Sequence, residues 1–401
     1  MYDVIVEGAR CAGASTAMLL ARRGHKVLLV DRDEFPSDMT PSTHMVWHVG
    51  VARLKAWGLI DRLAATGCPP MRTFNLDVGA FVLRGEAPPA GDVSECYAPR
   101  RHVLDGLLVE AAVEAGVDLR RGSIASPIGD QGRVDGVRYT DPAGRGREER
   151  ARIVVGAGGS NSVIAKTVDA PMYNQQPQLT GIVYGYFRDL PIDGMEFYSR
   201  PGRMIFAWST HDGLTLAGMC LPYADYPRLA ADPDRGIEEE WRMLVPEFHA
   251  RVREAKLVGG WRKGATRNFY RKSRGPGWAL VGDSGLTMDP ITAAGISNAF
   301  SEAERLAGAI DVGLRGVCRL DDALARYEAE RDAATLPLYG FTCEMAKLEP
   351  PPQQILDLMM ALSGDASAKR EYFGLFAQTV RVEDFFAPDN IARIIGAQNS
   401  G

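Results

Sequence analysis

A glycine-rich turn near the start of the chain has the residue types that bind a pyrophosphate. Gly8 and Gly13 bracket the run Gly-Ala-Arg-Cys-Ala-Gly, which lies between an apolar stretch and a helical one. The first glycine permits a tight turn, and the last lets helix and strand pack closely, so that the helix N-terminus offers free N–H groups to an anion. Asp31 ends the next apolar stretch, where its carboxylate can accept hydrogen bonds from ribose hydroxyls. This pattern predicts a binding site for an adenine dinucleotide.

Arg10 stands where this fingerprint usually has its middle glycine. A side chain is tolerated there if φ is negative, and the guanidinium could then reach a phosphate or lie in solvent. The carboxylate of Asp31 disfavours a 2′-phosphate, so the turn favours FAD or NAD over NADP. The residues expected to contact the nucleotide here are Gly8, Ala9, Arg10, Ala12, Gly13, Asp31 and Arg32.

A second group of residues, near position 283, separates FAD from NAD. The run Leu-Val-Gly-Asp-Ser ends an apolar strand and contains Asp283, and Pro290 and Gly295 precede a helical stretch. On these motifs, and in their order along nearly the whole chain, the sequence resembles the flavoproteins that include p-hydroxybenzoate hydroxylase-type monooxygenases and geranylgeranyl reductases. The resemblance implies one non-covalently bound FAD, with Asp283 on a ribityl hydroxyl.

The resemblance also implies positions for the flavin ring and the pyrophosphate. The helix after Pro290 would point its N–H groups at the flavin N1/C2 carbonyl, where a helix N-terminus stabilises the negative charge of the reduced ring. Arg101 would lie on the pyrophosphate side, and Ile124 would lie near the adenine. The cofactor contacts that the resemblance implies are Arg101, Ile124, Asp283, Pro290, Gly295 and Ile296.

A third motif of this flavoprotein group is altered. The group often has a G-A-D-G-x-x-S-x-x-R run that is linked to the handling of both flavin and NAD(P)H. Here Gly158 replaces the aspartate, and Lys166 is the best match to the arginine. NADH or NADPH is therefore expected only as a transient reductant, and both a separate reductant and a non-redox use of the flavin stay open.

His44 is the candidate catalytic residue. It ends the stretch Pro41–His44 on the loop after the second strand, which in the resembling group runs beneath the flavin. A histidine titrates near neutrality, so His44 could exchange a proton with the substrate or the flavin. The alternative is a structural hydrogen bond within the loop.

Aromatic side chains in the middle of the chain predict a substrate pocket. Their spacing suits one face of an antiparallel sheet, and an apolar, aromatic-lined cleft suits a lipophilic or aromatic ligand. The alternative is that these side chains fill an ordinary core. The predicted pocket residues are Tyr184, Tyr186, Phe206, Trp208 and Met219.

The pattern of apolar residues predicts the elements that hold these side chains. Apolar stretches over 2–7 and 26–31 flank a helix over 12–23, which is a β-α-β unit and indicates a parallel sheet. Residues 124–155 suggest an antiparallel excursion that returns to this sheet. The other predicted elements are helices over 51–63, 101–115, 237–252 and 293–313, strands over 117–121 and 278–281, and an antiparallel sheet within 172–274.

The predicted fold is α/β: a Rossmann-like FAD-binding domain, an inserted antiparallel substrate-binding sheet and a helical C-terminal region. Residues 1–70, 96–170 and 275–320 are assigned to the FAD-binding domain. Residues 71–95 and 171–274 are assigned to the substrate-binding sheet, and residues 321–401 to the helical region.

Composition excludes several other classes of protein. A net charge of −5 without long blocks of one sign argues against a nucleic-acid partner, which would need a basic face. Six cysteines without C-x-x-C spacing, and only six histidines, argue against a metal site or a disulfide framework. We expect a cytoplasmic protein with a small-molecule substrate and no membrane span, because no signal peptide and no long apolar stretch is apparent. The oligomeric state is not predicted.

The predicted activity is FAD-dependent monooxygenation, by which a small lipophilic or aromatic molecule is hydroxylated or epoxidised. One alternative is a flavin-dependent reductase of carbon–carbon double bonds, although residues 204–212 lack the proline of the W-x-F-P run in geranylgeranyl reductases. Another is an FAD-carrying protein with a binding or cyclase role. A flavin halogenase is disfavoured because the W-x-W-x-I-P run of those enzymes is missing.

Overall fold

The amino-terminal β-α-β unit forms as the sequence predicts. The computed structural model describes residues 1–39 and 42–398, so Pro41 lies outside the described residues. Strand β1 (Tyr2–Glu7), helix α1 (Cys11–Arg22) and strand β2 (Val27–Asp31) follow one another, and the two strands pair in parallel.

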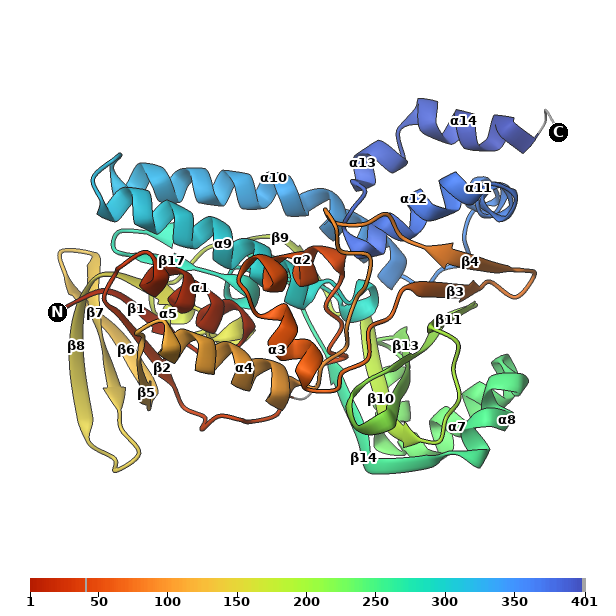
Figure 1. Cartoon of the computed structure of the whole chain (residues 1–401), viewed down its shortest axis with the longest axis horizontal. Coiled ribbons are helices and arrows are strands. Elements are labelled where there is room, and N and C mark those ends of the chain that lie inside the picture. Colours follow the sequence, from red (N-terminus) through yellow and green to blue (C-terminus); the bar gives the residue numbers. More distant parts are fainter. Residues whose placement is uncertain (40–41, 399–401) are drawn as a thin grey trace.

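This unit is the centre of an eight-stranded, mostly parallel sheet (Figure 1). The antiparallel excursion predicted from the sequence is the hairpin of β6 and β7, which leads into β8. The main path of the sheet runs β16 (Arg274–Gly275), β17 (Trp278–Leu280), β8 (Gly146–Gly156), β1, β2 and β5 (Asp118–Arg121), and β6 (Ser123–Asp130) and β7 (Arg133–Thr140) extend it from β8.

Both faces of the parallel sheet are covered. Because side chains alternate along a strand, Val4 and Val6 pack with α1, α4 (Arg101–Glu114) and α9 (Gly295–Leu314) on one face. Ile5 faces the other way and packs with β6, β7 and the short helix α5 (Val163–Thr167). Such two-sided burial is typical of a parallel sheet in an α/β fold.

A second sheet has seven strands and is largely antiparallel; it lies beside the first (Figure 1). Its strands come from both segments assigned to the substrate-binding sheet, although the domain boundaries themselves stay a prediction. In spatial order they are β14 (Lys256–Ala265), β10 (Thr180–Arg188), β13 (Leu214–Pro222), β12 (Arg203–Ser209), β11 (Met195–Arg200), β3 (Thr73–Asp77) and β4 (Val82–Glu86). A third, small sheet contains β18 (Leu286–Thr287), β15 (Asn268–Arg271) and β9 (Met172–Gln176).

The end of the chain is helical, as predicted. Figure 1 shows α10 running along α9, while α11 and α12 lie against β4. These helices are α10 (Leu320–Ala346), α11 (Gln353–Gly364), α12 (Ala366–Ala377), α13 (Val382–Phe385) and α14 (Pro388–Gln398).

Two helices predicted as continuous are interrupted. The stretch 51–63 is divided into α2 (His48–Ala56) and α3 (Ile60–Ala65), because Gly58 has φ +73° and ends the first helix. The stretch 237–252 is divided into α7 (Pro233–Leu244) and α8 (Pro246–Glu254), because Pro246 has no N–H and begins a new helix. A short helix, α6 (Tyr226–Ala231), precedes both.

Candidate functional site

The turn after β1 is too tight for a side chain at its first position. Gly8 has φ +90°, and a Cβ there would lie 2.6 Å from the carbonyl oxygen of Ala157. Gly13 is also restricted, because a Cβ there would lie 1.8 Å from the carbonyl oxygen of Gly8. The backbone is therefore bare where α1 begins, and this arrangement lets an anion approach helix N–H groups.

Asp31 fixes this turn from the end of β2. Its carboxylate accepts hydrogen bonds from the N–H groups of Ala9, at 2.6 Å, and Asp33, at 2.8 Å. Burial raises the pKa of Asp31 above its ordinary value, and the hydrogen bond from Ala9 opposes the rise. Arg32 instead points outward, with 76% of its side chain exposed, so the structure does not bring it into this group.

Arg10 is held by carboxylates rather than lying in solvent. Its φ is −92°, which satisfies the condition for a side chain at this position. The guanidinium lies 2.7 Å from the carboxylate of Asp105 and 2.9 Å from that of Asp33. Asp105 is fully buried and also accepts hydrogen bonds from Arg101 at 3.0 and 3.1 Å. Asp105 is not among the residues predicted from the sequence, although its position four residues after Arg101 on a helix is a signal for that pair.

The turn at Asp283 packs directly on the start of α1. Gly282 has φ +60°, and a Cβ there would lie 2.7 Å from the Cβ of Ala12. Burial raises the pKa of Asp283 to about 6, and the positive charge of Arg101 opposes the rise. The Asp283 side chain nevertheless stays accessible to solvent. The carboxyl group of Asp283 is therefore within reach of a ligand that approaches from solvent.

The start of α9 leaves open space beside this turn. Gly295 is exposed, and a Cβ there would meet nothing within 4 Å. The preceding residue, Ala294, provides no side-chain cap, so the first N–H groups of a 20-residue helix remain available. Ile296 is 8% exposed and packs in the core, so only its backbone can face the open space beside Gly295.

One unpredicted residue in this turn is Ala293. It has φ +50° and ψ +29°, a left-handed conformation that costs a non-glycine residue free energy. Strained backbone of this kind is often found at binding sites. Ala293 and Pro290, at either end of the turn Pro290–Thr292, both line the cavity described below.

These residues fit FAD. The bare turn at Gly8 suits the pyrophosphate, and the Asp31 carboxylate suits the ribose of the adenosine. Arg101 suits the pyrophosphate side, Asp283 suits the ribityl chain, and the open start of α9 suits the flavin. Ile124 is 9% exposed and packs in an apolar cluster with Leu28 and Val30 at β2. Its contact with an adenine stays a prediction.

The altered third motif has a structural explanation. A Cβ at position 158 would lie 2.7 Å from a carboxylate oxygen of Glu7, the last residue of β1. Glu7 accepts hydrogen bonds from the N–H of Val163, at 2.7 Å, and from the hydroxyl of Ser162 at the start of α5. Glu7 thus occupies the space beside Gly158, and an aspartate at 158 would place a second carboxylate next to it.

His44 lies on the loop after β2 and is buried against the antiparallel sheet. Its Nε2 is hydrogen-bonded to the hydroxyl of Tyr186, while no described residue partners its Nδ1. The residue has φ +66°. Burial, and then the charge of Arg101, lower the pKa of His44 well below its ordinary value. The expectation that His44 titrates near neutrality is therefore wrong, because burial and nearby arginines favour the neutral ring.

A hydrogen-bonded chain joins this loop to the cofactor residues. The Nη1 of Arg101 donates to the hydroxyl of Ser42 at 3.4 Å, and the N–H of His44 donates to the same hydroxyl at 3.3 Å. The hydroxyl of Tyr184 donates to the carbonyl of Ser42 at 2.8 Å. Arg101, the His44 loop and strand β10 are thus held in one network.

A narrow cavity of about 20 Å³ lies between the antiparallel sheet and the turn before α9. Phe206 and Trp208 line it from β12, and Pro290 and Ala293 line it from the α9 side. The other lining residues are Thr43, Trp47, Ile182, Phe197, Met204, Cys220, Ile291, Thr292 and Phe376.

Four of the five predicted pocket residues share one face of the sheet, and two of them, Phe206 and Trp208, line the cavity. Tyr184 on β10 lies opposite Gly218 on β13, and Gly218 lies opposite Phe206 on β12. The side chains of Tyr184 and Phe206 therefore point to the same side of the sheet. Met219 is the neighbour of Gly218 and points to the opposite face, where it packs with α7 and α8. The prediction for Met219 is wrong, and Cys220 takes the corresponding place in the cavity.

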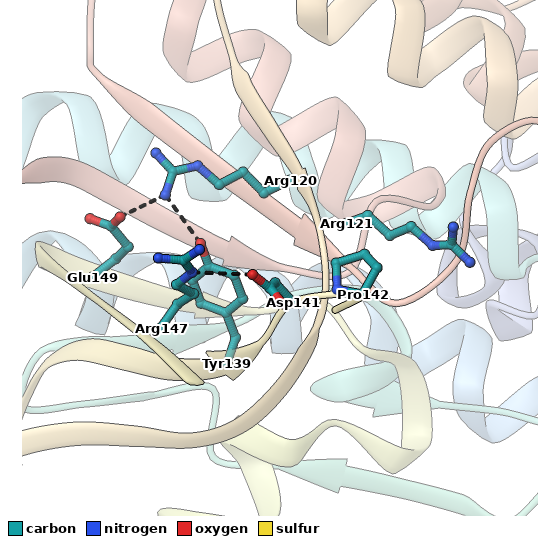
Figure 2. A pocket seen from close by; sticks show the side chains of 7 residues that line it. All are labelled: Arg120, Arg121, Tyr139, Asp141, Pro142, Arg147 and Glu149. Atoms are coloured by element: carbon teal, nitrogen blue, oxygen red, sulfur yellow. Dashed lines mark hydrogen bonds and ion pairs between the residues drawn. The ribbon is translucent and has the colours of Figure 1, made fainter. Parts of the chain in front are cut away.

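A larger surface hollow, of about 430 Å³, lies on β5, β7 and β8 (Figure 2). These strands are at the far end of the molecule from the antiparallel sheet (Figure 1). Its arginines are neutralised by carboxylates: Arg120 lies 2.6 Å from Glu149, Arg147 lies 3.2 Å from Asp141, and Arg121 lies 3.0 Å from Glu34. We therefore place the functional site at the narrow cavity and not at this hollow.

No helix in residues 1–39 and 42–398 is long and apolar enough to cross a membrane. Over the same residues no group of three or more histidine, cysteine, aspartate or glutamate side chains could hold a metal ion.

Comparison with known proteins identifies the family. Residues 1–338 match the family described as FAD binding domain, and the chain belongs to that family. It is an FAD-dependent oxidoreductase, which agrees with the flavoprotein resemblance seen in the sequence.

Three relatives illustrate the range of chemistry in this family. The chain is 25% identical to 1H-pyrrole-2-carbonyl-[peptidyl-carrier protein] brominase of Pseudoalteromonas luteoviolacea, over 79% of this chain and 78% of that protein. It is 25% identical to 6-methylpretetramide 4-monooxygenase of Streptomyces rimosus, over 83% and 82%. It is 30% identical to digeranylgeranylglycerophospholipid reductase 1 of Methanopyrus kandleri, over 78% and 80%.

The fold is shared with solved flavoproteins. A flavoprotein/dehydrogenase of Cytophaga hutchinsonii superposes with a TM-score of 0.83 at 17% identity, covering 99% of both chains. This likeness supports the α/β fold with a mixed parallel sheet, an antiparallel sheet and a helical C-terminus.

Proposed function

We propose that this chain is a monooxygenase that inserts one oxygen atom of O2 into a small aromatic or lipophilic molecule. The observation that carries the proposal is that the antiparallel sheet and the turn before α9 line the same narrow cavity. Its aromatic side, with Phe206 and Trp208, faces the turn from Pro290 to Ala293 that leads into the flavin-binding helix. The cavity of about 20 Å³ has room for little more than a water molecule, so it must widen when a substrate binds. An apolar substrate there would lie against the flavin side of the protein.

The protein residues have distinct tasks in this proposal. Reduced FAD supplies the electrons and activates O2. The aromatic wall would orient the substrate. His44, which is neutral, positions the hydroxyl of Tyr186 at the edge of this space.

The electron source is part of the proposal. NADH or NADPH can supply the electrons directly or through a separate reductase. The Glu7–Gly158 arrangement favours the second route, because it removes the aspartate that the resembling flavoproteins carry at this position.

Isotope labelling tests the proposal. Holoenzyme is incubated with NADH or NADPH under ¹⁸O2 and a panel of aromatic compounds, with and without an added flavin reductase. A product that gains one ¹⁸O atom is expected. Turnover of a substrate without incorporation of ¹⁸O would refute the proposal.

Two other activities are tested in the same assay. Reduction of carbon–carbon double bonds is favoured by the digeranylgeranylglycerophospholipid reductases among the relatives, which are 26–30% identical to the chain. Such a reductase would consume reduced flavin under argon with a polyprenyl alkene. Bromination, the activity of another relative, would appear as a brominated product when bromide is added.

A further inference from the structure

Tyr186, the partner of His44, is flanked by two arginines. The guanidinium carbons of Arg100 and Arg262 lie 4.7 and 4.6 Å from the centre of the Tyr186 ring. They come from distant parts of the chain, because Arg100 precedes α4 and Arg262 lies on the edge strand β14. Arg262 is directly opposite Tyr184 in the sheet, so it shares the face of the aromatic side chains.

The charges of these two arginines are poorly compensated. Arg100 has only distant carboxylates, 3.9 Å away on Asp38 and 4.0 Å away on Asp212. No described carboxylate lies within ion-pair distance of Arg262, whose guanidinium donates to the carbonyl of Gly260 at 3.0 Å. By contrast, the neighbouring Arg101 has a full ion pair at 3.0 Å with Asp105.

Three polar nitrogen atoms around Tyr186 are buried without a partner among the described residues. They are the Nε of Arg100, the Nε of Arg262 and the Nδ1 of His44. Buried donors without acceptors cost free energy, and they are usually satisfied by water or a ligand. Two guanidiniums and an imidazole form a donor set that suits an anion with planar oxygen atoms.

The aromatic cavity lies next to this group. Thr43 lines the cavity and precedes His44, and the indole N–H of Trp208 donates to the carbonyl of Thr43 at 3.2 Å. Tyr186 and Trp208 both pair with Leu216 of β13, so they point to the same side of the sheet. An apolar group in the cavity and an acidic group at the arginines can therefore belong to one small molecule.

We propose that Arg100, Arg262 and His44 form an anion subsite, so that the substrate is an aromatic or lipophilic acid with one carboxylate. This proposal rests on the proposed function for the position of the cavity, but it concerns substrate binding alone. Arg100 and Arg262 would bind the carboxylate, while the ring system packs against the stacked rings of Phe206 and Trp208, whose centres lie 4.8 Å apart.

Calorimetric titration of the FAD-loaded protein tests this subsite at constant ionic strength. The probes are benzoate and 2-naphthoate, each compared with its neutral amide, benzamide or 2-naphthamide. An acid should bind at least about tenfold more tightly than its amide. Arg262→Met should remove at least about tenfold of the acid affinity and leave the amide affinity unchanged. Lys263→Met, on the same strand with the same loss of charge, should change neither.

Several outcomes would overturn the subsite. They are equal affinity for acid and amide, no binding of any probe, or a loss of acid affinity in Lys263→Met as large as in Arg262→Met. FAD content verifies the fold of each variant, and Arg100→Met provides a second test if Arg262→Met loses FAD. Charge preference without ¹⁸O insertion would instead refute the monooxygenase and leave the subsite intact.

Discussion

Two ionisable side chains that are closely surrounded by protein, Asp283 and His44, shift toward their neutral forms for the same reason. Removing water from around a charge is unfavourable, so burial raises the pKa of the carboxyl group and lowers that of the imidazole. The positive charge of Arg101 opposes the shift of Asp283 and reinforces that of His44. Both groups therefore lie in a site where positive charge exceeds negative charge near the loop that carries His44.

Asp283→Asn is expected to stabilise the FAD-free protein near neutral pH. The folded-state pKa of Asp283 is about 6, above the ordinary value of 3.8, so the charged carboxylate destabilises the folded state above about pH 6. As the pH falls from 6 toward 3.8, the folded state takes up a proton and this cost disappears. Urea titrations should show a more stable variant at about pH 7.5 and no difference at about pH 4. Equal stability at the higher pH would contradict the account.

Gly158→Asp is expected to destabilise the protein by about 2 kcal/mol, because it places a second carboxylate, at an exposed position, against the buried carboxylate of Glu7. Glu7→Gln removes the negative charge and should reduce the penalty in the double variant by about 1 kcal/mol or more. The four unfolding free energies of this double-mutant cycle measure the coupling. Additive effects would show that the two positions do not interact.

At the scale of elements, the strongest periodic patterns predict the structure best. The β-α-β unit and α4 form as expected because their apolar faces are continuous. The errors come from single residues that interrupt a pattern, as Gly58 and Pro246 interrupt two predicted helices. Met219 shows the limit for strands, since side chains alternate and a shift of one residue reverses the face.

Ala293→Gly tests the strained turn that leads into α9. Alanine at φ +50° costs about 1 kcal/mol relative to glycine, although glycine is also more flexible when unfolded. We expect the FAD-free variant to gain up to about 1 kcal/mol in the free energy of unfolding, measured with urea. Ala294→Gly, at a residue with φ −81°, is the matched control and should not stabilise the protein. A stability gain in Ala294→Gly and none in Ala293→Gly would rule out strain at this residue.

At the scale of the whole molecule, the sequence predicts which segments would bind the cofactor, but it does not predict the packing contacts that hold these segments together. Gly8 and Asp283 carry recognisable motifs, whereas the contact between Gly282 and Ala12 depends on the packed fold. No motif identifies Asp105 or Glu7, because Asp105 contacts Arg10, and Glu7 contacts Val163, only after distant segments of the chain come together.

The candidate site lies where the loop after β2 meets the antiparallel sheet. The hydrogen bond between Tyr184 and Ser42 joins the loop after β2 to β10. The backbone N–H of Trp47 donates to the hydroxyl of Ser297 at 2.9 Å, which joins the end of this loop to the start of α9. Substrate and cofactor would therefore be positioned by one connected set of contacts.

FAD uptake tests the central claim most directly, namely that the turns at Gly8 and Asp283 close around one cofactor. FAD is titrated into purified, FAD-free protein whose fold is verified by circular dichroism, and binding is followed by calorimetry and flavin absorbance. The account predicts saturation at one FAD per chain. A correctly folded protein that stays colourless and takes up no FAD would contradict it.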